Sequence, residues 1–134
     1  MRTARGARTA RTRVAIAVTV VAVAAGAACG SGRRATPREV PGGNPDAGVV
    51  AIRRHGCGSC HEIPGVKGAS GLVGPPLLHW RRRSFIAGEL ANTPDNLMSW
   101  LRDPKAVEPG TDMPALGVTD QEARDITAYL YTIR

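Results

Sequence analysis

The chain contains one five-residue stretch, Cys57-Gly58-Ser59-Cys60-His61, that constrains its fold more than any other feature. Two cysteines that are separated by two residues and followed directly by a histidine are typical of covalent attachment of a c-type haem. Each thiol adds to one vinyl group of the porphyrin, and the adjacent His61 is thereby placed beneath the iron as an axial ligand. The stretch therefore predicts a small fold built around one haem c.

Three other interpretations of the two cysteines have less support from the residues. A thioredoxin-like redox pair needs a strand–helix–strand context, which the surrounding sequence does not show. A structural zinc site needs about four nitrogen or sulfur ligands, and only His55 and His79 could supplement this cluster. A plain disulfide across so short a loop is the third alternative.

Aromatic residues are scarce in this chain. They make up 4% of the sequence, and a domain of under about 90 residues is marginal without a disulfide, a metal or another crosslink. A haem would supply a large apolar body and a metal crosslink together. The composition therefore agrees with the prediction from the motif.

The first 28 residues have the pattern of an export signal. Five arginines precede an apolar run from Val14 to Ala28, which is interrupted only by Thr19. A basic region followed by such a run is typical of a secretory signal. The run is shorter than the roughly 20 residues of a membrane-spanning helix, although an uncleaved anchor is an alternative. We therefore predict an export signal peptide over residues 1–28.

The residues that lead to Cys29 resemble a lipoprotein processing site. Gly26-Ala27-Ala28-Cys29 ends in the cysteine that bacterial lipoproteins acylate, although leucine is usual at the first of these positions. Cys29 is also the odd thiol once Cys57 and Cys60 are assigned, and acylation accounts for it. Small residues just upstream allow ordinary cleavage, so soluble periplasmic export is the alternative. We expect lipidation of Cys29 and a membrane anchor on the extracytoplasmic side.

A Gly-, Ser-, Arg- and Pro-rich segment follows Cys29. From Gly30 to Gly43 it contains almost nothing apolar, which is typical of a flexible tether. We therefore predict a tether over residues 29–44 and one folded domain over residues 45–134.

The net charge of +7 lies mostly in the predicted signal peptide. From Cys29 onward, 13 Lys and Arg residues stand against 11 Asp and Glu residues, so the mature part carries about +2. No broad basic stripe is left and aromatic residues are few, so nucleic-acid binding has little support. We expect no nucleic-acid partner.

The predicted domain shows three helix patterns and no convincing strand pattern. Residues 44–55 open with Asn-Pro-Asp, which caps and starts a helix, and end before a glycine. Residues 93–104 open with Thr-Pro-Asp and end at a proline. Residues 119–133 open with a capping box between Thr119 and Glu122 and continue with apolar residues at helical spacing. The predicted class is all-α, with short helices and Gly/Pro loops wrapped around one haem.

Met113 is the best candidate for the second axial ligand of the iron. It lies in the loop 109–114, between two predicted helices, where it can fold back over the opposite haem face. A thioether ligand raises the reduction potential. Met98 lies on a helical apolar face and is better explained as core. His55 is too close to the attachment motif to cross the ring, and His79 is kept as an alternative ligand.

Five segments of the chain follow one another in an order and spacing that together form a known pattern. These are Gly48…Gly56–His61, Gly74–Leu77, Asn96–Pro104, Pro109–Met113 and Ile126–Leu130. With this pattern, residues 45–134 resemble the class I cytochromes c, especially the small bacterial ones that are attached to membranes or fused to respiratory oxidases. The resemblance implies the cytochrome c fold, one covalent haem and a role in electron transfer.

The resemblance also implies roles for individual residues. The carbonyl of Pro75 would accept a hydrogen bond from the second ring nitrogen of His61 and fix its tautomer. Trp100 would lie near the haem, and Thr111 would place a hydroxyl near the buried haem edge. Gly48 would let the first helix cross the last one closely.

The chain departs from the mitochondrial relatives at Asn92, where they have a tryptophan near a haem propionate. Asn92 still has an amide that can donate a hydrogen bond. The run Arg81-Arg82-Arg83 could supply charge to the propionates. It could equally be a solvated surface cluster or a docking patch for an acidic partner.

The sequence therefore predicts a membrane-tethered electron carrier that is not an enzyme. The resemblance suggests a quinol-oxidising complex as the electron donor and a terminal oxidase as the acceptor. One alternative is a haem domain with an open or displaceable sixth site that binds a gas or peroxide, as a sensor or an enzyme. The other is a fixed electron-relay subunit of a larger oxidoreductase.

Overall fold

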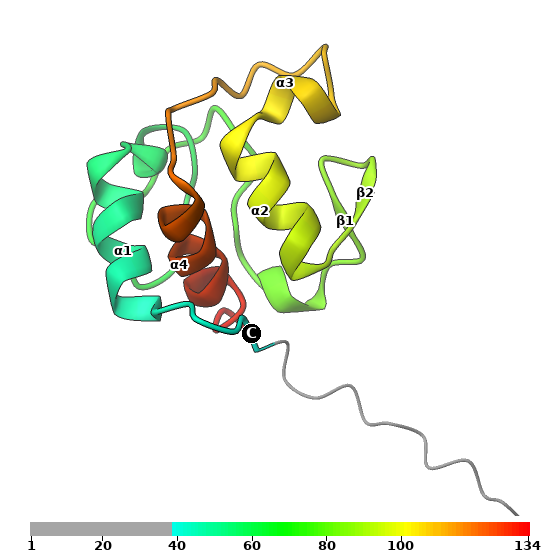
Figure 1. The fold of residues 1–134 in the computed structure, drawn as a ribbon. Coiled ribbons are helices and arrows are strands. Elements are labelled where there is room, and N and C mark those ends of the chain that lie inside the picture. The colour runs from blue at the N-terminus through cyan, green and yellow to red at the C-terminus, as the bar shows by residue number, and fades with distance from the viewer. Residues whose placement is uncertain (1–38) are drawn as a thin grey trace, which may run out of the picture. The chain divides into compact units, whose positions relative to one another are not determined.

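The computed structural model describes residues 39–134, and the fold is mainly helical (Figure 1). Its elements are α1 (Pro45–Arg54), η1 (Cys57–Ser59), η2 (Trp80–Arg82), β1 (Phe85–Ile86), β2 (Leu90–Ala91), α2 (Pro94–Arg102), α3 (Pro104–Val107) and α4 (Asp120–Leu130). Within this part of the chain, none of the helices is long and apolar enough to span a membrane. The predicted signal peptide, Cys29 and the tether up to residue 38 lie outside the described residues.

Helix α1 starts at the predicted cap. The side chain of Asn44 accepts hydrogen bonds from the backbone N–H groups of Asp46 and Ala47, at 3.0 and 3.3 Å. Its own backbone N–H donates to the buried carboxylate of Asp125 in α4, at 2.8 Å. The start of α1 is therefore held both by its own first turn and by the last helix.

Helices α1 and α4 cross at Gly48, and α4 lies between α1 and α2 (Figure 1). A Cβ atom on Gly48 would lie 2.2 Å from the carbonyl oxygen of Asp125 and 3.0 Å from Cβ of Tyr129. Such distances leave no room for a methyl group. The prediction that Gly48 permits this close crossing is confirmed.

The other two predicted helices also begin and end near their expected positions. Helix α2 is capped by Thr93, and α4 is opened by the predicted capping box between Thr119 and Glu122. The inner face of α2 is buried at Leu97, Trp100 and Leu101. Met98 is partly buried against the same core, as expected for a packing residue.

The short helices η1, η2 and α3 and the strands β1 and β2 were not predicted. Helix α3 begins at Pro104, so this proline ends α2 and also provides the first residue of the next turn. Strands β1 and β2 pair antiparallel around a turn in which Ala87 and Gly88 both have positive φ, at 52° and 82°. Strands of two residues are too short to show an alternating pattern, so the expectation of no strand was wrong for residues 85–91.

The packed domain begins earlier than the predicted boundary at residue 45. Val40 is buried, and the carbonyl of Gly42 accepts a hydrogen bond from the side chain of Gln121, at 3.0 Å. A Cβ atom on Gly43 would lie 2.8 Å from Cβ of Ala128. Residues 40–44, which were assigned to the tether, therefore pack on α4.

Candidate functional site

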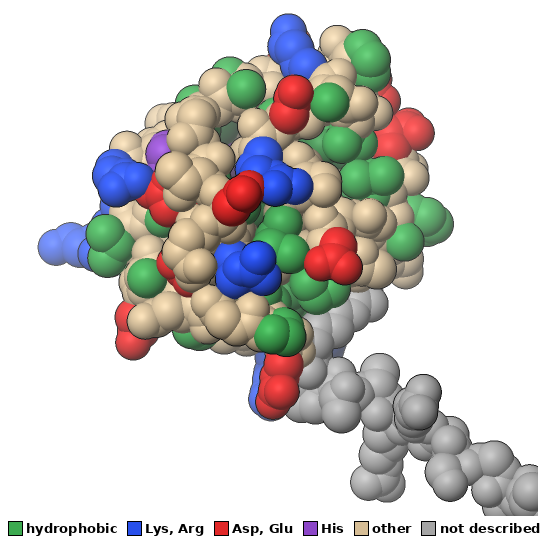
Figure 2. Space-filling view, viewed as in Figure 1, with side chains coloured by type: hydrophobic (Ala, Val, Ile, Leu, Met, Phe, Trp, Pro, Cys, Tyr) green, Lys and Arg blue, Asp and Glu red, His purple; other side chains and the backbone are tan. Residues whose placement is uncertain are grey.

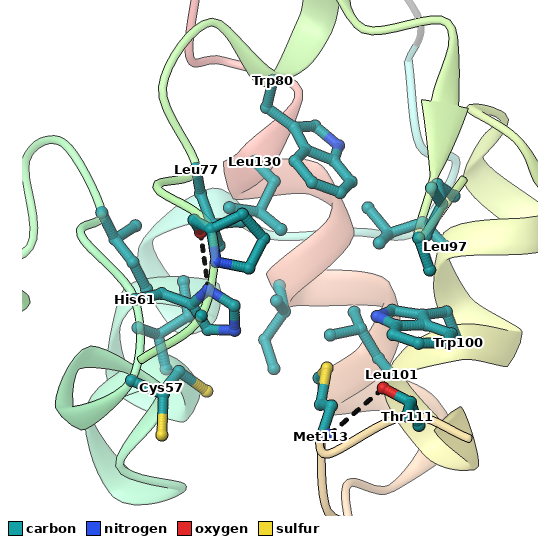
Figure 3. Close-up of a pocket in the computed structure, with 18 of the residues that line it drawn as sticks. Cys57, His61, Leu77, Trp80, Leu97, Trp100, Leu101, Thr111, Met113 and Leu130 are labelled. Carbon is teal, nitrogen blue, oxygen red and sulfur yellow. Dashed lines mark hydrogen bonds between the residues drawn. The ribbon is translucent and has the colours of Figure 1, made fainter. Parts of the chain in front are cut away.

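A pocket of about 400 Å³ opens between the helices and the loops that join them (Figure 3). Its walls are mainly apolar and include Ile52 from α1, Leu97 from α2, and Ile126 and Leu130 from α4. This size is within the range of cofactor and ligand sites. The pocket takes the place that a large aromatic core would otherwise fill.

The attachment motif forms one wall of this pocket. Gly56 has a φ of 67°, so the chain turns sharply after α1 and enters the short helix η1. The N–H of His61 then donates to the carbonyl of Cys57, at 3.0 Å. Cys57, Cys60 and His61 all line the pocket, and both thiols are free. Burial raises the pKa of the Cys57 thiol, so this thiol is protonated at neutral pH.

The ring of His61 is fixed by the loop that follows the motif. Its Nδ1 atom lies 2.8 Å from the carbonyl oxygen of Pro75, the acceptor that the resemblance implied. Because a carbonyl only accepts, Nδ1 carries the proton and Nε2 keeps its lone pair. Gly74 packs against the same ring, where a Cβ atom would lie 2.3 Å from the ring carbon Cε1.

Met113 lies on the opposite side of the pocket from His61 (Figure 3). Its backbone N–H donates to the hydroxyl oxygen of Thr111, at 3.2 Å. The N–H of Thr111 in turn donates to the carbonyl of Glu108, at 3.0 Å. Thr111 lines the pocket and also holds the loop that carries Met113, a contact that the sequence did not indicate.

The remaining predicted site residues divide into two groups. Trp100 is buried and lines the pocket beside Leu101 and Met113 (Figure 3). His55 does not line the pocket, because its Nε2 atom lies 3.2 Å from a carboxylate oxygen of Glu122. His79 is also outside the pocket wall, and its Nδ1 atom contacts the backbone carbonyl of Arg134 at 2.8 Å. The alternative of His79 as an axial ligand is therefore not supported.

The side chain of Asn92 makes hydrogen bonds to three other residues of the fold. Its amide group donates to the carbonyls of Trp80 and Arg83, both at 3.0 Å. Its amide oxygen accepts from the hydroxyl of Tyr131, at 2.7 Å. Asn92 is buried and does not line the pocket. Both N–H groups of its amide are therefore used within the fold, and neither is left for a propionate.

Two pocket residues close to Asn92 were not assigned to the site from the sequence. Trp80 is buried and lines the pocket, and its Nε1 atom has no hydrogen-bond partner among the described residues. Arg83 also lines the pocket, and its guanidinium carbon lies 5.2 Å from the centre of the Trp80 ring. Of the run Arg81–Arg83, only Arg83 lines the wall of this pocket. The sequence contains few aromatic residues, and this scarcity was the signal that could have identified Trp80 as a residue of the site.

The donor set fits a haem. A flat apolar space has two thiols at one wall, while an imidazole nitrogen and a thioether sulfur approach it from opposite sides. These are the side chains that attach a haem and occupy both axial positions of its iron. Within residues 39–134, no three His, Cys, Asp or Glu side chains gather into a metal-binding cluster, so these residues do not provide a structural zinc site.

Two exposed apolar side chains line the pocket. Val73 is 83% exposed and Phe85 is 60% exposed. Leu72, next to Val73 in the chain, is 88% exposed. On the face shown in Figure 2, positive and negative side chains are interspersed and do not form one basic patch.

A family model described as cytochrome c matches residues 46–134. A relative named cytochrome c2, from Rhodoplanes tepidamans, is 35% identical over an alignment of 98 residues that covers 63% of this chain and 88% of that protein. Two proteins named cytochrome c oxidase subunit 2 are also similar over 88 residues. The one from Alkalihalophilus pseudofirmus is 31% identical and the one from Bacillus sp. 32%, with 65% and 63% of this chain matched.

This chain spans about a quarter of the length of those two oxidase subunits, since the match covers 25% of each. Among solved structures, cytochrome c2 from Rhodobacter sphaeroides matches with a TM-score of 0.47 and 21% identity. That match covers 68% of this chain and 96% of the other.

Proposed function

The chain belongs to the cytochrome c family of electron-transfer proteins, which carry a covalently attached haem c, and we propose that it shuttles electrons between respiratory-chain complexes outside the cytoplasm. The observation that carries this proposal is the arrangement of His61 and Met113 on opposite sides of one apolar pocket. An iron held by both groups has no open position, which suits electron transfer and not ligand chemistry.

In this proposal, Cys57 and Cys60 would hold the haem through thioether bonds, and His61 and Met113 would bind its iron. The bound haem would supply reversible one-electron oxidation and reduction of its iron. The Pro75 carbonyl keeps the proton of His61 on Nδ1, and it makes Nε2 a more basic ligand. The hydroxyl of Thr111 holds the backbone at Met113, so that the sulfur is presented from a fixed loop.

The two residues that would bind the iron are each held in place by contacts within the chain. The His61 ring is held between the Pro75 carbonyl and the backbone of Gly74, and the Met113 loop is held by its own hydrogen bonds. Apolar side chains of α2 and α4 line the centre of the site. Fixed ligands in an apolar pocket favour rapid electron transfer with little rearrangement.

Electrons would enter and leave at the exposed edge near the thioethers. Leu72 and Val73 belong to a loop that packs on the attachment motif, because the N–H of Gly71 donates to Gly58 and that of Gly74 donates to Cys60. Both side chains project into solvent. A small apolar rim is suited to brief contact with a redox partner.

We further propose that the protein is tethered to the membrane on its periplasmic side by a lipid on Cys29, downstream of an export signal at residues 1–28. Tethering raises the effective concentration of the domain near membrane-bound partners. The similarity to two proteins named cytochrome c oxidase subunit 2 supports a terminal oxidase as the electron acceptor. A quinol-oxidising complex is the donor in this proposal.

Intact mass spectrometry of membrane-extracted protein tests the lipid anchor on Cys29. An N-terminus at Ala25 or Ala28 without acyl mass would contradict it.

Carbon monoxide binding tests the carrier function. We expect the reduced protein at neutral pH to resist carbon monoxide, because Met113 fills the sixth position. Rapid and complete binding would favour a gas- or peroxide-binding role over electron shuttling. The measurement is the visible absorption spectrum of the reduced protein before and after addition of the gas.

A fixed relay subunit is the second candidate function, and the similarity to the two oxidase subunits favours it. In this role the domain would stay bound inside a larger oxidoreductase. Purification of the native protein under mild conditions separates the two candidates. A stable monomer without a partner supports the shuttle, and stoichiometric co-purification with other subunits supports the relay.

A further inference from the structure

The indole nitrogen of Trp80 is a buried hydrogen-bond donor that the site described above does not use. Trp80 is 5% exposed, and its Nε1 atom has no partner among the described residues. Buried polar atoms in folded proteins are almost always paired. The missing acceptor is therefore expected to be something that occupies the pocket lined by Trp80.

The polar groups around Trp80 have other partners, and none of them accepts from its indole nitrogen. The carbonyls of Trp80 and Arg83 accept from Asn92, and the guanidinium of Arg83 donates to the carbonyls of Pro76 and Leu78. The same guanidinium lies over the Trp80 ring, 5.2 Å from its centre. An orphaned donor and a cation therefore share one end of the pocket, which suits an anionic acceptor.

The anionic acceptors that a haem provides are its two carboxylate side chains, and these would lie at the Trp80 end of the pocket. The two vinyl groups lie on one edge of the porphyrin, and the two carboxylate side chains lie on the opposite edge. Thioether bonds to Cys57 and Cys60 would fix the vinyl edge at the wall formed by the attachment motif. In Figure 3, Trp80 lies at the end of the pocket remote from Cys57, with its ring extending into the pocket.

We propose that the indole N–H of Trp80 donates a hydrogen bond to a carboxylate of the bound haem, with the Arg83 charge beside it. This inference rests on the proposed attachment of haem through Cys57 and Cys60. Asn92 is not available for this contact, because its amide is engaged in holding Trp80, Arg83 and Tyr131 together.

The other charged groups of the pocket wall lie elsewhere. Glu108 and Asp112 also line the pocket, but they belong to the loop that carries Thr111 and Met113, which lies away from Trp80 in Figure 3. Arg83 is thus the charged side chain of the pocket wall that accompanies Trp80. The charge of Arg83 is the same in every variant of the test, so it does not contribute to differences in potential between the variants.

The test is the reduction potential of the haem-loaded protein as a function of pH. A hydrogen bond to a carboxylate favours its charged form and lowers its pKa. Trp80→Phe keeps an aromatic ring but removes the N–H, so we expect the carboxylate-linked step in potential to move to higher pH by about one unit, a tenfold change in proton affinity. Tyr129→Phe is the control, because it removes a hydroxyl that donates to the carbonyl of Pro64 and does not line the pocket. It should leave the position of this step unchanged.

If Trp80→Phe does not fold, a measurement on the unaltered protein tests the proposal instead. The indole ¹H–¹⁵N signal of Trp80 in the reduced protein should shift over the same pH step that the potential reports. Coincident pH curves for the variant and the unaltered protein would overturn the proposal. So would an indole signal that does not respond to pH or that exchanges with a bound water. A protein that takes up no haem would contradict the proposed function, whereas a loaded protein without these shifts contradicts only the role of Trp80.

Discussion

The Nδ1 atom of His61 lies 2.8 Å from the carbonyl oxygen of Pro75. The contact joins the last residue of the attachment motif to a loop that is fourteen positions further along the chain. The loop comes this close because Gly74, directly before Pro75, has no side chain to separate its backbone from the ring. The orientation of the His61 ring is therefore set by its contact with the Pro75 carbonyl, and this contact requires a glycine at position 74.

Gly74→Ala should displace the His61 ring. The added Cβ atom would lie 2.3 Å from Cε1 of His61, and overpacking of this kind typically costs 1–3 kcal/mol. We expect the haem-loaded protein to lose about 2 kcal/mol in free energy of unfolding, and its low-spin absorption bands to weaken. Denaturant unfolding together with the visible spectrum measures both effects.

Gly110→Ala is the matched control for this substitution. A Cβ atom there would meet only the flexible carboxylate end of Glu108, at 3.0 Å. We expect a change within about 0.5 kcal/mol. Equal losses in the two variants would mean that the contact between Gly74 and His61 does not determine the geometry of the ligand.

Met113→Leu should remove the sulfur ligand while keeping a side chain of similar size. We expect the sulfur–iron charge-transfer band of the oxidised protein to disappear, the reduction potential to fall, and the reduced protein to bind carbon monoxide. Met98→Leu is the control, because Met98 packs against the core and does not line the pocket. A Met98 variant that loses the band while the Met113 variant keeps it would reassign the ligand.

Gly48→Ala should destabilise the crossing of α1 and α4. Alanine favours a helix over glycine by about 1 kcal/mol, but here its Cβ atom would lie 2.2 Å from the carbonyl oxygen of Asp125. We expect a net loss of about 1–3 kcal/mol in free energy of unfolding. Val50→Ala, at a 62% exposed position of the same helix, should change it by less than about 0.5 kcal/mol. A stabilised Gly48 variant would contradict the close crossing.

Tyr129 should make the fold sensitive to alkaline pH. Its hydroxyl donates to the carbonyl of Pro64, and desolvation by burial raises the pKa of the phenol. The unfolded chain therefore loses this proton first, so the free energy of unfolding should fall as pH rises above about 10. Tyr129→Phe should cost about 1 kcal/mol at neutral pH, through the lost hydrogen bond, and should flatten the alkaline decline. Unfolding of the reduced protein at several pH values measures the slope, and an unchanged slope in the variant would refute the assignment.

The parts of the fold that were predicted correctly depend on neighbours in the sequence. The Asn44 cap of α1 and the capping box of Thr119 and Glu122 each place donor and acceptor within three residues of each other. Such signals are visible without the fold. The attachment motif is equally local, so the sequence was enough to locate Cys57, Cys60 and His61 on one wall.

The features that were missed depend on contacts between distant segments. Asn92 reaches its partner Tyr131 across 39 positions, and nothing near Asn92 in the sequence indicates that its amide is occupied. Asn92 also holds the backbone carbonyl of Trp80, a pocket residue that lies 12 positions earlier in the chain. The hairpin at 85–91 turns at Ala87, a residue type that rarely adopts positive φ, so its turn has no clear sequence signal.

The most direct test of the covalent site is the mass of the tryptic peptide 55–67, which contains both Cys57 and Cys60. Protein produced in a cell with working haem-attachment machinery should yield this peptide with the added mass of one haem and with neither thiol free to alkylate. A peptide of unmodified mass with two reactive thiols, or one joined by a disulfide, would contradict the account.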